Sequence, residues 1–320
     1  MKRPAAIALL LAAPNVLAQG GATQYPNKPV RLIVPFAPGA TDIVARIVAK
    51  KLSDAWGQQF VIDHRPGAGG AVGSELTARA TPDGYTLMLA NPGPSVHSVL
   101  LRKNPTYTLD DFAPVIYIGY TPMVIAVHAK FAPNNAAELI AYAKARPGKI
   151  SWGSAGLNSN PHIALEKLKS VTGVNITHVP YKGSGPAMTD VISGQIDAMF
   201  TTTITVTPHF NAGRVKVIGV AGAKRQALLP DTPTLAEQGI AGADTTTWLG
   251  LVTAAKTPRA IIEQLNTEAN KALLSNDARQ QLAQLGIEIE GGAPAKFAAV
   301  IKAEADSIVR LLKAGIVRSE

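Results

Sequence analysis

The sequence predicts an α/β fold with mostly parallel sheets, arranged as two domains. Apolar runs typical of buried strands alternate with segments in which apolar residues recur at helical spacing, the order expected when helices connect parallel strands. The chain has 320 residues, a length that favours two domains over one. Hydrophobic residues make up 47% of the chain, which is ample for two full cores.

The expected strands are the short apolar runs of the chain. They cover 30–34, 60–62, 85–90, 112–119, 123–128, 150–152, 175–179, 198–200, 215–220 and 245–252. The expected helices carry apolar residues three or four positions apart, as Ile43, Ile47 and Leu52 do before Gly57 ends the first helix. They cover 41–56, 73–80, 136–145, 163–172, 186–193, 258–275, 278–284 and 294–314.

Two crossings of the chain define the predicted domains. Thr121 and Pro122 separate two β-like runs and mark the first crossing. The β-like run 245–252 marks the second crossing, where the chain returns to the first domain. Domain 1 is therefore discontinuous and comprises 25–121 and 246–320, and domain 2 comprises 122–245. Two domains joined by two crossings can close on a ligand by a hinge motion, and ligands of open α/β sheets bind beyond the carboxyl ends of the strands. A single larger α/β domain is the alternative.

Residues 1–18 have the pattern of a secretory signal peptide. Lys2 and Arg3 precede a short apolar run over 5–13, and a small-residue cleavage pattern ends at Ala18. The run is too short to remain as a helix that spans a bilayer. We therefore expect cleavage after residue 18 and a mature protein in the periplasm, with an uncleaved cytosolic N-terminus as the alternative.

Composition excludes several classes of function. The chain has no cysteine, so disulfides, thiol catalysis and thiolate metal sites are absent. Its net charge of +9 comes from scattered basic residues, a pattern that attracts small anions but is not that of a nucleic-acid-binding protein. The six histidines are dispersed without metal-ligand spacing. The loop Gly67–Gly73 departs from dinucleotide-binding spacing, so we expect neither a metal nor a cofactor.

Three glycine-bearing loops form the predicted binding site, over 35–42, 153–162 and 181–187. The first and third lie between a strand-like and a helix-like run, so each opens a helix. Helix starts leave backbone N–H groups unpaired and carry the positive end of the macrodipole. Two such ends facing each other would make a socket for an anion such as a carboxylate.

Individual residues of these loops have expected local roles. Thr41 suits the N-cap of the first helix, and Pro186 suits the first position of the later helix. Asp42 is expected to lie outside the socket, since its charge would repel an anion. Lys182 could pair with an acid or be a solvated loop lysine, and His162 could face the ligand or be a structural histidine.

Catalysis by a loop serine is the main alternative function. Ser154 and Ser184 lie in glycine-containing turns, but the chain has no G-x-S-x-G motif. No base adjoins either serine in the sequence, although a residue distant in the sequence could still serve. An exported α/β hydrolase therefore stays open beside a binding protein.

Short motifs along the mature chain resemble a known family. They are Tyr25-Pro26, Lys28-Pro29, 35–42, 65–70, 82–85, 154–162, 179–183, 194–197, 229–234, 248–250 and Thr257-Pro258. Each is weak alone, but in this order they are similar to the periplasmic solute-binding proteins of tripartite tricarboxylate transporters, the Bug family. The resemblance implies a type II periplasmic-binding-protein fold, with two Rossmann-like lobes joined by two crossover strands.

The resemblance also implies how the ligand is held. In the family, backbone and small polar groups of two facing loops hold a carboxylate. The ligand-binding residues expected here are Phe36, Ala37, Pro38, Gly39, Ala40, Thr41, Asn91, Ser154, Asn158, Lys182, Gly183, Ser184, Gly185, Pro186, Ala187 and Trp248. Phe36, Asn91, His97 and Trp248 are expected near the distal end of the ligand. Ala40 and Asn158 depart from glycines common in the family, which leaves the identity of the ligand open.

The implied function is an extracytoplasmic receptor without enzymatic activity. It would capture a small carboxylate between two lobes and deliver it to membrane permease subunits. We expect a monomer that binds no nucleic acid. A sensor that presents its ligand-bound form to a membrane partner is a further alternative.

Overall fold

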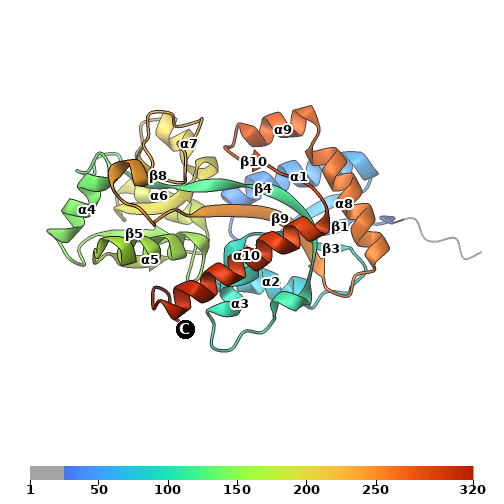
Figure 1. The fold of residues 1–320 in the computed structure, drawn as a ribbon. Coiled ribbons are helices and arrows are strands. Elements are labelled where there is room, and N and C mark those ends of the chain that lie inside the picture. The colour runs from blue at the N-terminus through green and yellow to red at the C-terminus, as the bar shows by residue number, and fades with distance from the viewer. Residues whose placement is uncertain (1–24, 320) are drawn as a thin grey trace, which may run out of the picture.

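The computed structural model describes residues 25–319, in which strands and helices alternate along most of the chain (Figure 1). The strands are β1 Val30–Val34, β2 Phe60–His64, β3 Thr86–Ala90, β4 Phe112–His128, β5 Ser151–Ser154, β6 Thr177–Pro180, β7 Ala198–Thr202, β8 Val215–Ala221, β9 Thr246–Ala254 and β10 Glu288–Ile289. The α-helices are α1 Ala40–Trp56, α2 Ala71–Ala78, α3 Ser98–Leu100, α4 Ala136–Lys144, α5 Asn160–Thr172, α6 Ser184–Ser193, α7 Thr203–Asn211, α8 Arg259–Leu273, α9 Asn276–Ala283 and α10 Pro294–Lys313. Short helical turns are η1 Ala68–Gly70, η2 Gly93–His97, η3 Leu109–Asp111 and η4 Ala236–Gln238.

Strands β4 and β9 connect two groups of parallel strands. The order is β2-β1-β3-β9-β4-β7-β5-β6, in which β1 is parallel to β2 and β3, and β5 is parallel to β6 and β7. Strand β4 pairs with β9 up to Pro122 and with β7 and β8 from Met123 onward. The change of partner coincides with the predicted domain boundary, but the boundaries themselves stay a prediction.

The expected break of β4 at Thr121-Pro122 was wrong, because β4 is one strand of 17 residues. Proline lacks the N–H that a ladder bond needs, so it fits only where no such bond is required. Pro122 lies where the strand changes partner, and Pro114 lies beside a register shift against β9. Both prolines are therefore tolerated inside a long strand.

Helix starts also differ from the predicted positions. The N-cap of α1 is Gly39 rather than Thr41, which lies inside the helix. Helix α6 begins at Ser184 after Gly183, so Pro186 is the third helical residue and not the first. In both cases a glycine supplies the extended backbone before the helix, and a side-chain cap is lacking.

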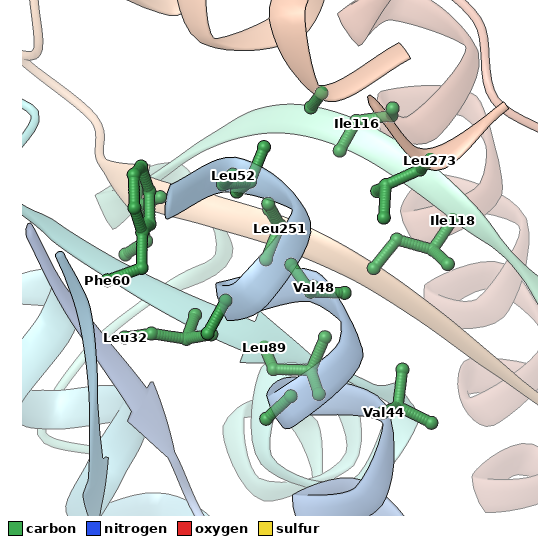
Figure 2. Packing of buried hydrophobic residues seen from close by; sticks show 14 of the residues in the cluster. Leu32, Val44, Val48, Leu52, Phe60, Leu89, Ile116, Ile118, Leu251 and Leu273 are labelled. Atoms are coloured by element: carbon green, nitrogen blue, oxygen red, sulfur yellow. The ribbon is translucent and has the colours of Figure 1, made fainter. Parts of the chain in front are cut away.

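Separate hydrophobic clusters lie on the two sides of the change of partner. On one side, Leu52 of α1 packs against a cluster that includes Leu32 of β1 and Leu251 of β9 (Figure 2). On the other side, Trp152 and Phe200 are buried in a cluster formed by residues 123–243. Burying one such large apolar side chain contributes roughly 1.5–3 kcal/mol, so each group of strands has a substantial core.

Four helices begin directly after parallel strands. Helix α1 follows β1, and α5, α6 and α7 follow β5, β6 and β7. Because the carboxyl ends of parallel strands meet at one edge of a sheet, α5, α6 and α7 start at the same edge. Within residues 25–319, none of the helices combines the length and apolar character needed to cross a membrane. The predicted signal peptide lies outside the described residues.

Candidate functional site

The first and third glycine-bearing loops contact each other directly. The Ala37 N–H donates to the Lys182 carbonyl oxygen at 3.1 Å. A Cβ atom added to Gly39 would lie 3.0 Å from Ser184 Oγ, and one added to Gly185 would overlap the Pro38 carbonyl oxygen. Glycine at these positions therefore allows the starts of α1 and α6 to approach closely.

A cavity adjoins this contact and draws its walls from both groups of strands. Its lining residues are Phe36, Ala37, Ala40, Thr41, Asn91, Met123, Ala155, Asn160, Pro161, Ser184, Thr201, Thr202, Ile204, Thr247 and Leu249. The cavity has a volume of about 70 Å³. This is room for several water molecules, so the cavity accommodates a solute of only a few carbon atoms.

The starts of α1, α5, α6 and α7 all contribute to the lining. At none of these four starts does the N-cap side chain accept a hydrogen bond from the helix. The first N–H groups of a helix have no partner within the helix itself. The cavity therefore lies beside an unusual number of backbone donors and the positive ends of four helix dipoles.

Two threonines of the cavity wall have hydroxyl groups without a hydrogen-bond partner. Thr201 Oγ1 and Thr202 Oγ1 are buried and make no hydrogen bond. Leaving a buried polar group unpaired costs about 1–3 kcal/mol, so such groups in a native fold call for an explanation. Both threonines belong to the wall of the cavity.

The lining contains no ionisable side chain. Asp42 follows the lining residue Thr41, but its carboxylate accepts from Arg46 Nε at 2.9 Å and lies 2.8 Å from His64 Nε2. Asp42 does not line the cavity, which agrees with the expectation that it stays outside the socket. Any charge on a ligand would thus be balanced by backbone and hydroxyl dipoles rather than by a cation.

Six of the expected ligand-binding residues line the cavity. They are Phe36, Ala37, Ala40, Thr41, Asn91 and Ser184. Seven others belong to the two contacting loops without lining the cavity, namely Pro38, Gly39, Lys182, Gly183, Gly185, Pro186 and Ala187. The remaining three, Ser154, Asn158 and Trp248, are outside the lining, and so is His97. Whether the six bind a ligand stays a prediction.

Sequence reasoning missed nine residues of the lining, which are Met123, Ala155, Asn160, Pro161, Thr201, Thr202, Ile204, Thr247 and Leu249. In β9, Thr247 and Leu249 line the cavity in place of the expected Trp248, because neighbouring side chains of a strand point to opposite faces. The run of three threonines after the strand-like segment 198–200 was an available signal for Thr201 and Thr202. Ala155, Asn160 and Pro161 belong to the second predicted loop.

Neither loop serine is placed to act as a nucleophile. Ser154 has a histidine neighbour, with its Oγ 2.6 Å from His178 Nε2, but Ser154 is fully buried, so a substrate cannot reach its hydroxyl group. Ser184 Oγ has Thr205 Oγ1 as a side-chain neighbour at 3.5 Å, and threonine is not a base. The geometry gives no support for a serine hydrolase.

A polar cluster lies beside the second loop. The rings of His162 and His178 stack with centroids 4.2 Å apart, and burial first of all lowers the pKa of each to about 4. Asn158 has a left-handed backbone with φ of 59°, and its N–H donates to His162 Nδ1 at 3.1 Å. Among residues 25–319 no group of three metal-ligating side chains comes together.

Comparison with known proteins places this architecture in a family. The family model for the tripartite tricarboxylate transporter family receptor matches residues 44–315. Protein BugT of Bordetella pertussis is 34% identical over 285 residues, which cover 88% of this chain and 87% of BugT.

Two solved relatives have ligands. A Rhodopseudomonas palustris protein with adipate is 34% identical, with a TM-score of 0.89 over 92% of this chain and 99% of that chain. MatC from the same organism, with bound malate, is 30% identical, with a TM-score of 0.85 over 88% of this chain and 98% of that chain. The fold is that of periplasmic binding proteins, as predicted. The chain belongs to the family of tripartite tricarboxylate transporter receptors, which are binding proteins rather than enzymes.

Proposed function

We propose that this protein captures a small carboxylate in the cavity between the starts of α1, α5, α6 and α7. The observation that carries the proposal is the combination of four uncapped helix starts with two unpartnered threonine hydroxyls around one neutral cavity. Helix N-termini favour anions through their free N–H groups and their dipoles. No lysine or arginine is needed to balance the charge.

The ligand class is supported by size as well as by donors. Relatives of known structure hold malate and adipate, and the cavity suits an acid of only a few carbons. Hydrogen bonds to a charged group contribute roughly 1.5–3 kcal/mol each. Three or four of them, offset by ordering and desolvation, bring the net free energy near that of micromolar affinity, about −8 kcal/mol.

Donors from both predicted lobes explain how capture would be linked to closure. Thr41 belongs to the first predicted lobe, whereas Ser184 and Thr202 belong to the second. A ligand that contacts both stabilises the arrangement in which the lobes meet. We propose that this form, as a monomer in the periplasm, delivers the acid to membrane permease subunits. A sensor partner would use the same form and would be separated from a permease by a partner assay.

Calorimetry with mono-, di- and tricarboxylates, with the corresponding amides as neutral controls, tests the ligand class. We expect one acid to bind with micromolar affinity and its amide not to bind. Binding of a neutral solute in place of every acid would contradict the proposal. Mass spectrometry of material released when the purified protein is denatured would identify an acid retained from the cell.

Ser184→Leu tests whether the acid binds in this cavity. Its larger side chain would collide with the first loop, where Gly39 lies against Ser184, so binding should be lost while the melting temperature changes little. Ser193→Leu, at the exposed far end of the same helix, is the control and should bind normally. Retention of full affinity by the Ser184 variant would show that the acid sits elsewhere.

A further inference from the structure

Two buried asparagines line the cavity, one from each predicted lobe. Asn91 follows β3 and is 6% exposed, and Asn160 is the first residue of α5 and is 5% exposed. A buried amide side chain requires partners both for its oxygen, which accepts, and for its N–H₂ group, which donates. The atoms that the protein leaves without partners therefore indicate what a ligand in the cavity must supply.

The protein fixes the orientation of the Asn160 amide. Its Nδ2 donates to the Thr246 carbonyl oxygen at 2.9 Å and lies 3.5 Å from Met123 Sδ. Because a carbonyl oxygen can only accept, the N–H₂ group and not Oδ1 must face Thr246. No donor to Oδ1 occurs within residues 25–319, and Oδ1 is not one of the fully enclosed atoms that lack a partner. Oδ1 is therefore accessible from the cavity that Asn160 lines.

The Asn91 side chain makes no hydrogen bond with the described part of the chain. Neither of its amide atoms has a partner there, and neither is fully enclosed. Ala90 pairs with Gly250 of β9, and the Asn160 amide is bonded to Thr246 of the same strand. Both amides thus adjoin β9, and neither takes part in the contact between the starts of α1 and α6.

The group that best satisfies Asn160 Oδ1 is a hydroxyl. A hydroxyl donates to Oδ1, and its oxygen can still accept from an N–H₂ group such as that of Asn91. A second carboxylate can only accept, so it would leave Oδ1 unpaired. An ammonium group could donate, but the lining has no carboxylate side chain to balance its charge, and the positive ends of the helix dipoles oppose a cation.

We propose that the captured acid is a hydroxy acid, and that Asn160 and Asn91 are the residues that select its hydroxyl group. This inference rests on the proposed function, which assigns the carboxylate to the helix starts. The hydroxyl then lies toward β9, within reach of the two amides. A site built to bond a hydroxyl discriminates against the analogue without it, because a buried polar group of the site is left unpaired.

Calorimetry with pairs of acids that differ by one hydroxyl tests the selection. The pairs are lactate and propionate, 3-hydroxybutyrate and butyrate, and malate and succinate. In the pair that binds most tightly, the hydroxy acid should bind about tenfold to a hundredfold more tightly than its partner, as expected when one buried acceptor loses its donor. The corresponding amino acid, which is alanine, 3-aminobutyrate or aspartate, should also bind more weakly than the hydroxy acid.

Two leucine variants locate the selection, since leucine has nearly the shape of asparagine without its polar atoms. In Asn160→Leu the acceptor is gone, so the ratio of affinities within the best pair should fall close to one. Asn91→Leu should lower the ratio as well. Asn211→Leu, at the exposed end of α7, is the matched control and should keep the full ratio.

The ratio separates loss of selection from general damage, because a distorted cavity weakens both members of a pair. If Asn160→Leu does not fold, Asn91→Leu decides, since its side chain gives up no hydrogen bond to the described residues. Equal affinities within every pair, or an unchanged ratio in both variants, would overturn the inference and leave the proposed function standing. Binding of a neutral solute in place of every acid would instead defeat the proposed function, and with it the choice of a hydroxy acid.

Discussion

At the scale of single residues, glycine decides how closely the two loops approach. A methyl group on Gly185 would overlap the Pro38 carbonyl oxygen, and backbone cannot yield as a flexible side chain does. Gly185→Ala should therefore abolish acid binding or weaken it more than a hundredfold, while the separate cores keep the melting temperature within a few degrees. Calorimetry and thermal denaturation measure the two effects, with Ser193→Ala as the control. Unchanged affinity would mean that the lobes need not touch.

The threonines without hydroxyl partners, Thr201 and Thr202, give a second prediction. Their replacement should weaken binding without lowering the stability of the fold. Valine has nearly the shape of threonine without the hydroxyl, so Thr201→Val and Thr202→Val should leave the free energy of unfolding unchanged or raise it. If the hydroxyls serve the ligand, each variant should lose about 1.5–3 kcal/mol of binding free energy.

Thr207 supplies the matched control for these variants. Its Oγ1 is also buried without a partner, and it lies on α7 but not in the cavity lining. Thr207→Val should therefore bind the acid as the unaltered protein does. Chemical denaturation and calorimetry on the three variants decide the matter. Equal affinity in all three would show that Thr201 and Thr202 do not contact the ligand.

At the scale of elements, the sequence predicted loops better than it predicted helix starts. The order of strand, glycine-bearing loop and helix located α1, α5 and α6, because glycine and proline mark turns independently of tertiary context. Helix α7 was missed because its start, Thr203 to Thr207, is rich in β-branched residues that favour strands. Tertiary contacts override that preference, and no local pattern reveals them.

The sequence also does not reveal which face of a strand lines a cavity. In β9, Trp248 was expected near the distal end of the ligand, yet Thr247 and Leu249 line the cavity. Trp248 instead donates to Glu304 of α10. A period of two gives two possible faces, and only the packing of α10 against one of them determines which face remains for the ligand.

The contact between α5 and β6 makes the protein sensitive to acid. Burial lowers the pKa of His162 and of His178 from 6.5 to about 4, so both rings are neutral in the fold but protonated sooner in the unfolded chain. Stability is therefore full above about pH 6.5 and is lost as the pH falls toward about 4. For His162 the loss is at most about 3 kcal/mol.

Thermal denaturation as a function of pH checks this expectation. His162→Gln keeps an acceptor for the Asn158 N–H but cannot take up a proton, so the acid loss of stability should shrink. His128→Gln, outside the cluster, is the control and should follow the unaltered protein. The same acid slope in the His162 variant would assign the loss to other groups.

At the scale of the whole molecule, the two predicted lobes contact each other at several points besides the shared strands. Gly69 packs against the Leu157 carbonyl group, and Gly93 packs against Ser159. These contacts connect residues before position 122 to residues after it, as the Ala37–Lys182 hydrogen bond does. In the described arrangement the predicted lobes therefore already touch, and a ligand would add to these contacts.

Because the chain has no native cysteine, an engineered pair can report closure without background. A Cβ atom on Gly183 would lie 3.5 Å from Ala37 Cβ, within the range that a disulfide requires. Because Gly183 has a positive φ and its added Cβ would lie 3.2 Å from the Ala37 carbonyl oxygen, the Gly183→Cys single variant is first checked for acid binding. Ala37→Cys combined with Gly183→Cys should cross-link under mild oxidation, faster when a bound acid increases the closed population. Electrophoresis without reductant measures the rate, and each single cysteine variant is a control. A rate that is the same with and without the acid would mean that binding does not shift the lobes, and the affinity would then have to come from a cavity already closed in the free protein.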